Sequence, residues 1–503
     1  MTKDRRYRGI WSLIAACLLG AHATAWSAPL TFTVNSTTDA VDTAPGNGVC
    51  ATAAGACTLR AAIQEANAHA GLDTISIPAG TYVLTIAGRD EDLAATGDLD
   101  ITDTVTIAGA GAPTVIIDGN GIDRVFDVFP SGTTTISGVT IRNGNPGEAS
   151  GGGIISAGVG GGVVTLNLSN VIVTRNTAAG FGGGIANSDV LSLSDVTVSD
   201  NTCPEPGCLG GGLYNSGTAT LNRVTVSGNS SATGGGGIGT DFDVNVTNVT
   251  LSGNSANIGA AMEHKNGLAT LTNVTITGNT ATPGGGAFLN LADVTFKYTI
   301  FAHSPAGEAC VNSGTSFVSM GHNIDVGTGC ALTATGDLSN TDPVLGSLQS
   351  NGGPTQTHAL LAGSPAIDAG GTDCPPPATD QRGTTRPMDG NHDGISRCDI
   401  GAYELNAAAS TTTTTVTTST TTTTVGLRCG DVNGDGAVNI GDALVVAQYD
   451  VGLRTCGQSP FSHPDRCDVN RDGGCNIGDA LRIAQCEVGL ISCNFTCGTF
   501  SCP

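Results

Sequence analysis

The sequence is poor in aromatic and in basic side chains. Only 4% of its 503 residues are Phe, Trp or Tyr, and 20 Lys and Arg stand against 43 Asp and Glu, which gives a formal net charge of -23. A nucleic-acid-binding surface needs clustered Lys and Arg to displace the counterions of phosphate groups, so we expect no nucleic-acid partner. Beyond the N-terminal segment no apolar run is long enough to span a bilayer, and we expect no transmembrane segment in the mature chain.

The first 28 residues have the organisation of a secretory signal peptide. Basic residues up to Arg8 precede an apolar stretch from Ile10 to about Gly20, and small residues follow where a signal peptidase cuts. The cut is expected after Ala25 or Ala28, because "ATA" has small residues at both required positions while "WSA" does not. The protein is therefore expected to be secreted, and to be extracellular or associated with the cell surface.

The 17 cysteines point to disulfide bonds. Cys17 lies in "IAAC", which fits a lipoprotein site, although apolar "LLGA" follows it where a mature lipoprotein turns polar. Without Cys17 the mature chain holds an even number, which in an exported protein favours disulfides over catalytic thiols. Close spacing suggests the pairs Cys50 with Cys57, Cys203 with Cys208, Cys310 with Cys330 and Cys374 with Cys398. The other eight lie beyond residue 428, and spacing alone does not give their connectivity.

A repeated unit occupies the middle of the chain. The segments "GVTIRNGN", "NVIVTRNT", "DVTVSDNT", "RVTVSGNS", "NVTLSGNS" and "NVTITGNT" place an asparagine at 143, 176, 201, 229, 254 and 279, and from Asn176 the steps are 25, 28, 25 and 25 residues. Apolar and polar residues alternate in each unit, as a β-strand with one buried face requires. Glycine triplets such as "GGGI" at Gly182 permit sharp corners, and stacked asparagines can hydrogen-bond along a column. These features predict a parallel β-solenoid.

A coil of this length, with three short strands and asparagine at a turn, resembles the right-handed parallel β-helix of pectate-lyase-like and polymorphic outer-membrane proteins. The resemblance extends loosely upstream through Val105 to Gly121, and it implies a mainly β fold. A helix is expected from Thr58, its N-cap, to Gly71, where it would cover the open N-terminal end of the coil. This helix resembles the "CSLREA" segment of bacterial secreted proteins, departs from it at Thr58 and Ala61, and that family label carries no known reaction.

The remaining chain divides by composition. "SNGGPTQTHALLAGSPAIDAG", "DQRGTTRP" and "CDIGAYE", between Asn351 and Glu404, resemble the segment that closes many exported bacterial β-helices before an anchoring element. An almost pure threonine run follows, and its composition predicts an extended linker. We expect six segments: a signal peptide (1–28), an N-terminal cap with the first coils (29–137), the repeated coils (138–345), a closing segment (346–406), the linker (407–426) and a terminal module (427–503).

The terminal module contains two copies of a calcium-loop pattern. Both place oxygen donors at positions 1, 3, 5, 9 and 12, a backbone carbonyl at position 7 and glycine at position 6, which is the spacing that wraps one chain around Ca²⁺. Loop one has Asp431, Asn433, Asp435, Ala437, Asn439 and Asp442 at the donor positions, with Gly436 at the bend. Loop two has Asp468, Asn470, Asp472, Gly474, Asn476 and Asp479, with Gly473 at the bend. We expect two bound Ca²⁺ ions.

Each loop runs into an amphipathic segment, "DALVVAQYDVGL" or "DALRIAQCEVGL", without the entering helix of an EF-hand. Paired loop-helix units behind a threonine linker resemble a type I dockerin, a family that binds two calcium ions and docks on cohesin domains. Dockerins usually have small hydroxylic residues at positions 10 and 11, which recognise the partner. In this sequence the residues at those positions are Ile440, Gly441, Ile477 and Gly478. Eight cysteines are also unusual for a dockerin. The partner is thus either a cohesin-type protein or the module's own chain.

Two further features bear on function. A weaker third loop, with Asp389, Asn391, Asp393 and Gly394, has Ile400 at position 12 and reads more readily as a structural turn than as a metal site. At "AAMEHKNG" the glycine corner is replaced, which puts Glu263, His264 and Lys265 together as candidate acid or base groups, the simpler interpretation being a solvated loop.

A further column precedes the asparagines, with Arg142, Arg175 and Asp200 on successive units, and we interpret it as a surface ion-pair column. Two function classes remain. The first is a β-helix that binds carbohydrate or another surface and is tethered by the dockerin-like module, and the second is a dockerin-borne polysaccharide lyase or glycoside hydrolase. Clustered carboxylates with a base would favour the enzyme, and bare Thr, Ser and Asn columns would favour binding.

Overall fold

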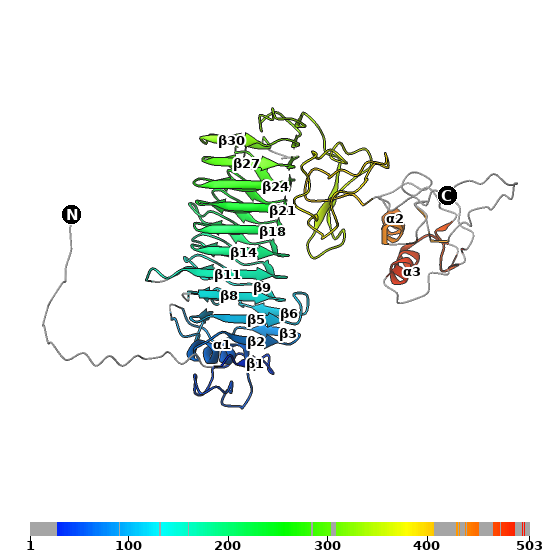
Figure 1. Ribbon diagram of the computed structural model, residues 1–503. Coiled ribbons are helices and arrows are strands. Elements are labelled where there is room, and N and C mark those ends of the chain that lie inside the picture. Colours follow the sequence, from blue (N-terminus) through cyan, green and yellow to red (C-terminus); the bar gives the residue numbers. More distant parts are fainter. Residues whose placement is uncertain are drawn as a thin grey trace. The chain divides into compact units, whose positions relative to one another are not determined.

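A computed structural model describes residues 28–406, except 90, 130–131, 159, 283–284 and 303–307, and in the C-terminal part residues 429–430, 432, 438, 440–451, 466–472, 474–487, 495 and 497. The chain divides into two compact units between Ser410 and Thr411 (Figure 1). The predicted signal peptide, apart from Ala28, and the predicted linker lie outside the described residues. No described helix is long and apolar enough to cross a membrane.

The first unit is a stack of parallel strands, and it confirms the predicted parallel β-solenoid (Figure 1). A nine-stranded sheet contains β4 (Leu99–Ile101), β7 (Phe126–Val128), β10 (Ile154–Ser156), β13 (Ile185–Asn187), β17 (Leu213–Asn215), β20 (Ile238–Thr240), β23 (Met262–His264), β26 (Phe288–Asn290) and β29 (Cys310–Asn312). A four-stranded sheet contains β16 (Thr202–Cys203), β19 (Ser230–Ser231), β22 (Ser255–Ala256) and β25 (Thr280–Ala281).

The largest sheet has nineteen strands. They are β1 (Thr31–Thr33), β2 (Asp73–Ile77), β3 (Gly80–Val83), β5 (Val105–Gly109), β6 (Val115–Asp118), β8 (Gly132–Ser137), β9 (Thr140–Arg142), β11 (Val164–Ser169), β12 (Ile172–Thr174), β14 (Val190–Ser194), β15 (Thr197–Ser199), β18 (Thr218–Ser227), β21 (Val244–Ser252), β24 (Leu268–Thr277), β27 (Asp293–Lys297), β28 (Ile300–Phe301), β30 (Ser316–Ser319), β31 (Ile324–Asp325) and β32 (Leu338–Ser339). Alternate side chains of these strands fill one continuous apolar core, as the sequence alternation predicts.

The predicted asparagine column exists inside the solenoid from Asn176 on. Asn143 is not part of it, because Arg142 pairs in register with Thr174, which leaves Asn143 one residue early, and its amide donates to Asp118 at 3.0 Å. The side-chain amide of Asn201 donates to the side-chain oxygen of Asn229 at 2.9 Å, and that of Asn229 donates to Asn254 at 3.0 Å. Asn176 and Asn279 continue this column, which we call the asparagine ladder, and all five side chains are fully buried. Each amide also donates to a backbone carbonyl, so the ladder satisfies polar groups that burial would otherwise leave unpaired.

Helix α1 (Leu59–Ala68) lies at the N-terminal end of the solenoid, as predicted (Figure 1). The hydroxyl of Thr58 caps it by accepting from the backbone N–H of Ala61 at 3.2 Å. The helix ends at Ala68, before the expected stop at Gly71, and His69 supplies the C-cap. Arg60 is fully buried and anchors the helix through Asp39, at 2.6 Å, and through the backbone carbonyl of Gly97.

The closing segment packs on the outer side of the solenoid. It contains the antiparallel pair β33 (Leu345–Gln349) and β34 (Thr357–Leu360). The hydroxyl of Thr250 on β21 donates to the side chain of Gln381 at 2.7 Å, and Ser252 on the same strand lies 2.9 Å from the ring of His358. These contacts fix the segment against strands more than 100 residues earlier in the chain.

The structure confirms the four predicted disulfides, Cys50–Cys57, Cys203–Cys208, Cys310–Cys330 and Cys374–Cys398. In the second unit it adds Cys429–Cys497 and Cys467–Cys475. This unit holds helices α2 (Ile440–Asp450) and α3 (Ile477–Glu487). Residues at matching positions of the two predicted loops, such as Val432 and Val469, share its core.

Candidate functional site

The second predicted calcium loop brings three carboxylates together. One oxygen from each of Asp468, Asp472 and Asp479 lies within 4.8 Å of the others. Asp468 and Asp479 are buried and Asp472 is exposed, so the carboxylates converge at the module surface. Such a set of hard oxygen donors on a short loop fits Ca²⁺ in its chemistry.

Local hydrogen bonds hold this arrangement. The backbone N–H of Asp472 donates to the carboxylate of Asp468 at 3.1 Å and to the side-chain oxygen of Asn470 at 2.8 Å. The carboxylate of Asp479 accepts from the backbone N–H groups of Asn470 and Asn476, both at 3.1 Å. Burial raises the pKa of Asp479, backbone hydrogen bonds oppose this, and the negative charges of Asp472 and Asp468 raise it further. A cation at this place would relieve that repulsion.

The structure describes less of the first loop. Asp431, Asn433, Asp435, Ala437 and Asn439 lie outside the described residues. Asp442 is fully buried at the start of α2, where its carboxylate accepts from the backbone N–H of Val432 at 2.9 Å. Asp479 occupies the same position of α3 and also accepts from the start of its own loop. The residue at position 12 thus connects the loop to the start of the helix by a hydrogen bond in both halves. At the second site, Ca²⁺ would be held by Asp468, Asn470, Asp472, Gly474, Asn476 and Asp479.

An apolar hollow of about 530 Å³ lies between the two helices. Leu444 from α2 and Ile477 and Leu481 from α3 line it, and each is between 56% and 59% exposed. Ile477 and Gly478, the residues at positions 10 and 11 of the second loop, belong to this lining. Exposed large apolar side chains gathered around a hollow are typical of a surface that binds another protein.

The candidate residues on the solenoid lie on β23 and just after it, in the nine-stranded sheet. Glu263 points outward and is only 2% exposed, because its side chain lies against the corner residues Gly234, of the preceding rung, and Gly259. Its Oε2 atom has no hydrogen-bond partner, and Oε1 lies 3.7 Å from the ammonium group of Lys265. Burial raises the pKa of Glu263, which Lys265 opposes. The interpretation as a solvated loop is therefore wrong.

The structure separates His264 from Glu263. Adjacent residues of a strand point to opposite faces, so the fully buried His264 faces inward. It pairs in register with Thr240 and Asn290, and its Nε2 lies 3.1 Å from the carbonyl oxygen of Asp293. A nitrogen beside a carbonyl oxygen must carry the proton, and burial lowers the pKa of His264. The ring is an internal group of the solenoid.

Two residues that the sequence did not suggest join Glu263. Tyr214 and Glu263 occupy the middle positions of β17 and β23, with Gly239 in register between them. The Tyr214 hydroxyl donates to Asp241 Oδ2 at 2.8 Å, whereas Asp241 Oδ1 is buried without a hydrogen-bond partner. Burial and this bond raise the pKa of Tyr214. Phe181 stacks on Tyr214, with ring centroids 4.7 Å apart.

A second acidic cluster lies nearer the N-terminal end of the same sheet. One oxygen from each of Asp98, Asp100 and Asp127 lies within 4.8 Å of the others. Arg124 donates to Asp98 at 3.0 Å and to Asp127 at 2.7 Å, and so neutralises part of the charge. Burial, and then Asp98, raise the pKa of Asp100 to about 8. The coils before residue 138 depart from the repeat, so the alignment gave no signal for this cluster.

The remaining sequence candidates have structural roles. Arg142 donates to Asp118 of the preceding rung at 2.9 Å, whereas no ion pair joins Arg175 to Asp200 within the described solenoid. The third loop is a turn: the carboxylate of Asp389 accepts from the backbone N–H groups of Asp393 and Gly394. Asp399, the carboxylate one residue before position 12 of this loop, is buried and accepts from the backbone N–H of Asp368 at 2.7 Å.

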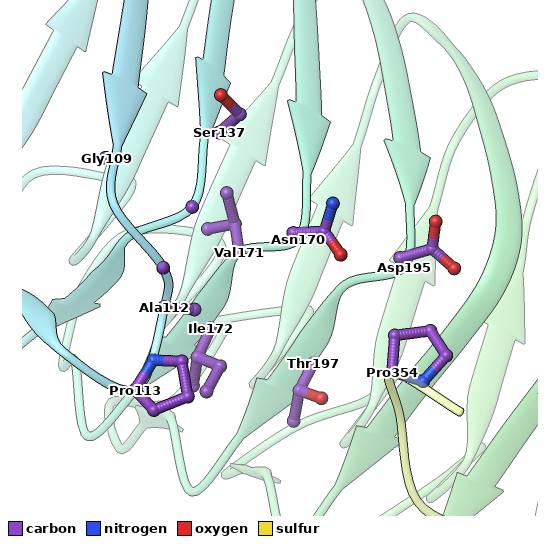
Figure 2. A pocket seen from close by; sticks show the side chains of 12 residues that line it. Gly109, Ala112, Pro113, Ser137, Asn170, Val171, Ile172, Asp195, Thr197 and Pro354 are labelled. Carbon is purple, nitrogen blue, oxygen red and sulfur yellow. The ribbon is translucent and has the colours of Figure 1, made fainter. Parts of the chain in front are cut away.

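A groove of about 490 Å³ lies on the outer side of the nineteen-stranded sheet (Figure 2). Its floor includes Ile172 and Thr197, and Pro354 of the closing segment forms part of its wall. Asp195, also in the wall, is paired with Arg223 at 2.6 Å, so its charge is already neutralised. Among the described lining residues none is a predicted site residue.

Comparison with known families finds that residues 429–486 match the dockerin type I domain. This match confirms the predicted dockerin-like module. No curated protein matches the chain. Among solved structures, the chain is similar to that in "Crystal structure of pectate lyase Pel9A", with 12% identity and a TM-score of 0.42, over 76% of this chain and 98% of that one. The resemblance of the helix near Thr58 to the CSLREA segment stays a prediction.

Proposed function

We propose that the C-terminal module binds two Ca²⁺ ions and docks on a cohesin-type protein, and that it thereby tethers a secreted β-solenoid to an extracellular assembly or to the cell surface. The observation that carries the proposal is the dockerin type I match over residues 429–486. The converging carboxylates of Asp468, Asp472 and Asp479 support it, since they offer the hard oxygen ligands that Ca²⁺ takes. The disulfides and the predicted signal peptide support an oxidising location outside the cytoplasm.

The docking surface in this proposal is the apolar hollow between α2 and α3. Its exposed side chains Leu444, Ile477 and Leu481 would be desolvated by a partner, which is the usual source of affinity at the centre of a protein interface. The alternative occupant is the module's own chain, since Cys429–Cys497 already joins the end of the module to its start.

Calcium titration of the purified full-length protein by calorimetry tests the first step, with Asp431→Ala and Asp468→Ala as matched variants. Two binding events, each lost with its own substitution, are expected, together with a calcium-dependent gain in helical circular dichroism. Absence of calcium-dependent heat in the wild-type protein would refute the proposal.

The solenoid has the features of a binding face in this proposal. On the nineteen-stranded sheet, outward Thr, Ser and Asn side chains stack in register over eight rungs, and all are at least partly exposed: Thr106, Thr135, Asn167, Ser192, Thr220, Asn245, Thr270 and Thr295. Hydroxyl and amide groups both donate and accept hydrogen bonds, as polysaccharide hydroxyls do. The column therefore supports carbohydrate or surface binding.

Sedimentation with insoluble cellulose, chitin and xylan tests this face. Thr220→Val, Thr270→Val and Thr295→Val together keep the β-branched shape and remove three hydroxyls. The triple variant is expected to bind at least about tenfold less than the wild type if the hydroxyls make the contact, at roughly 0.5–1.5 kcal/mol for each hydrogen bond. Equal binding by both proteins would remove the column from the proposal.

The second candidate function is a polysaccharide-degrading enzyme. It is favoured by Glu263, a buried outward carboxyl group with a raised pKa, beside Lys265 and near Asp241. A protonated carboxyl can donate to a glycosidic oxygen while a second carboxylate acts as base or nucleophile. Reducing-sugar release and the ultraviolet absorbance of unsaturated products would detect hydrolase and lyase activity. Glu263→Gln should lower such an activity roughly 100-fold or more. The same change at the exposed Glu148, Glu148→Gln, serves as the control.

A further inference from the structure

The second calcium loop is closed by a disulfide. Cys467 immediately precedes Asp468, the residue at position 1, and Cys475 occupies position 8. The two cysteines are bonded to one another, and both are buried in the core of the module beside Val469 and Ile483. The covalent ring thus includes Asp468, Asn470, Asp472 and Gly474, which are four of the six predicted calcium ligands.

This ring restricts the conformations that the loop can adopt before an ion binds. Without an ion, Asp468 and Asp472 repel one another and an open loop would let them separate. Closing a short loop covalently removes many of those open conformations, so less conformational entropy is lost when the ligands converge. Preorganisation of this kind increases affinity without adding a contact to the ligand.

The first loop has the same predicted ligands but no such cross-link. The residues at the positions equivalent to Cys467 and Cys475 are Gly430 and Val438. They are neighbours, because a Cβ atom added to Gly430 would lie 2.8 Å from Val438 Cγ1. A glycine and a valine make only a non-covalent contact here, and the φ of +98° at Gly430 would strain a cysteine at that position.

We propose that the Cys467–Cys475 disulfide is a covalent clasp that preorganises the second calcium loop, and that it makes this loop the tighter of the two sites. Cys467 and Cys475 are positioning residues here: they contact no ion and act through the ligands between them. The inference rests on the proposed calcium-binding function of the module. It adds that two sites with matching ligands differ in affinity.

Calcium titration of full-length variants tests the clasp. Cys467→Gly combined with Cys475→Val gives loop two the residue pair of loop one, and Cys467→Ser with Cys475→Ser removes the bond in a second way. Both variants are expected to lose the tighter binding event and to show a site weakened about tenfold or more. Asp468→Ala identifies which event belongs to loop two. Removing the disulfide outside the loops, by Cys429→Ser with Cys497→Ser, should leave loop two the tighter site.

Hydrogen exchange of the wild-type protein gives a test without substitutions. In the presence of EDTA the amides of residues 468–479 should exchange more slowly than those of residues 431–442, and mild reduction of the protein should remove the difference. Equal exchange of the two loops, or unchanged affinity in both loop-two variants, would overturn the clasp while leaving calcium binding intact. Failure of the wild-type protein to bind calcium at all would instead refute the proposed function.

Discussion

Asp100 on β4 and Asp127 on β7 are register partners, so two outward carboxylates lie side by side on adjacent rungs of the solenoid. Asp98 adds a third within 4.8 Å. Burial, and then a neighbouring carboxylate, raise the pKa of Asp98 to about 7 and that of Asp100 to about 8. Burial also raises the pKa of Asp127 to about 6, although the charge of Arg124 opposes it. These carboxyl groups therefore bind protons more readily in the folded chain than in the unfolded chain.

This arrangement predicts that the protein loses stability as the pH rises. Because the folded pKa values exceed the unfolded value near 3.8, the stabilising effect of protonation is complete below about pH 4 and is lost as the pH rises through 6 to 8. The free energy of unfolding, measured in urea, should be larger at pH 5 than at pH 8.5. Asp100→Asn should raise it by about 1–2 kcal/mol at pH 8.5 and change it little at pH 4. A wild-type stability that is independent of pH between 5 and 8.5 would contradict the prediction.

The asparagine ladder should be sensitive to a single break. Asn229 donates to Asn254 and to the carbonyl oxygen of Val198, and it accepts from Asn201. Asn229→Ala leaves these groups buried without partners and should lower the free energy of unfolding by about 2–4 kcal/mol. Asn245→Ala removes an exposed amide on the next long strand and should change it by less than about 0.5 kcal/mol. A similar decrease in the free energy of unfolding for both variants would show that the buried ladder contributes no more to stability than an exposed amide does.

The closing segment should depend on a buried ion pair. The Arg386 guanidinium donates to Glu404 and to the carbonyl oxygen of Gly401, both at 2.8 Å, and both charged side chains are fully buried. Arg386→Ala leaves Glu404 without its cation and should destabilise the segment by about 3–5 kcal/mol. Limited proteolysis followed by mass spectrometry would show cleavage between residues 346 and 406.

Arg397 provides the matched control for this substitution. It pairs with Asp393 at 3.6 Å, and both side chains are more than 40% exposed, so Arg397→Ala should cost less than about 1 kcal/mol. Equal resistance of the Arg386 and Arg397 variants to protease would rule out a structural role for the buried pair.

The periodic part of the fold could be predicted from the sequence. Alternation and a repeat of about 25 residues follow from local geometry, and an asparagine that recurs at that period must stack on its counterparts. The dockerin module was equally predictable, because each of its two loop patterns lies within twelve consecutive residues. Four disulfides followed from cysteines close in sequence.

The outward column of the nine-stranded sheet could not be predicted in this way. Its strands are only three residues long, and a one-residue change at a glycine corner decides which side chain faces outward. Glu263 and His264 are adjacent in sequence but lie on opposite faces of β23. Tyr214 and Asp241 are hydrogen-bonded although they come from different rungs. No pattern of neighbouring residues in the sequence predicts that contact.

The apolar hollow of the terminal module leads to a last prediction. Leu481 is 58% exposed on α3 and lines the hollow with Leu444 and Ile477. Leu481→Asp should leave calcium-dependent folding unchanged, because the side chain is not part of the module's core. It should weaken docking about 30-fold or more, since truncation of a central apolar anchor commonly costs 2 kcal/mol or more. Biolayer interferometry against a panel of purified cohesin domains, with and without calcium, measures this effect.

The control for docking lies on the other unit. Leu361 is 46% exposed on the closing segment and does not line the hollow, so Leu361→Asp adds the same charge outside that lining and should leave cohesin binding unchanged. If Leu481→Asp binds as the wild type does, the hollow is not the docking surface, even if calcium-dependent binding persists. A third outcome would point to the module's own chain. If no cohesin binds the calcium-loaded wild-type protein, and if Leu481→Asp makes the C-terminal tail sensitive to protease, then the hollow binds the module's own chain. An intramolecular contact would need the same apolar anchor.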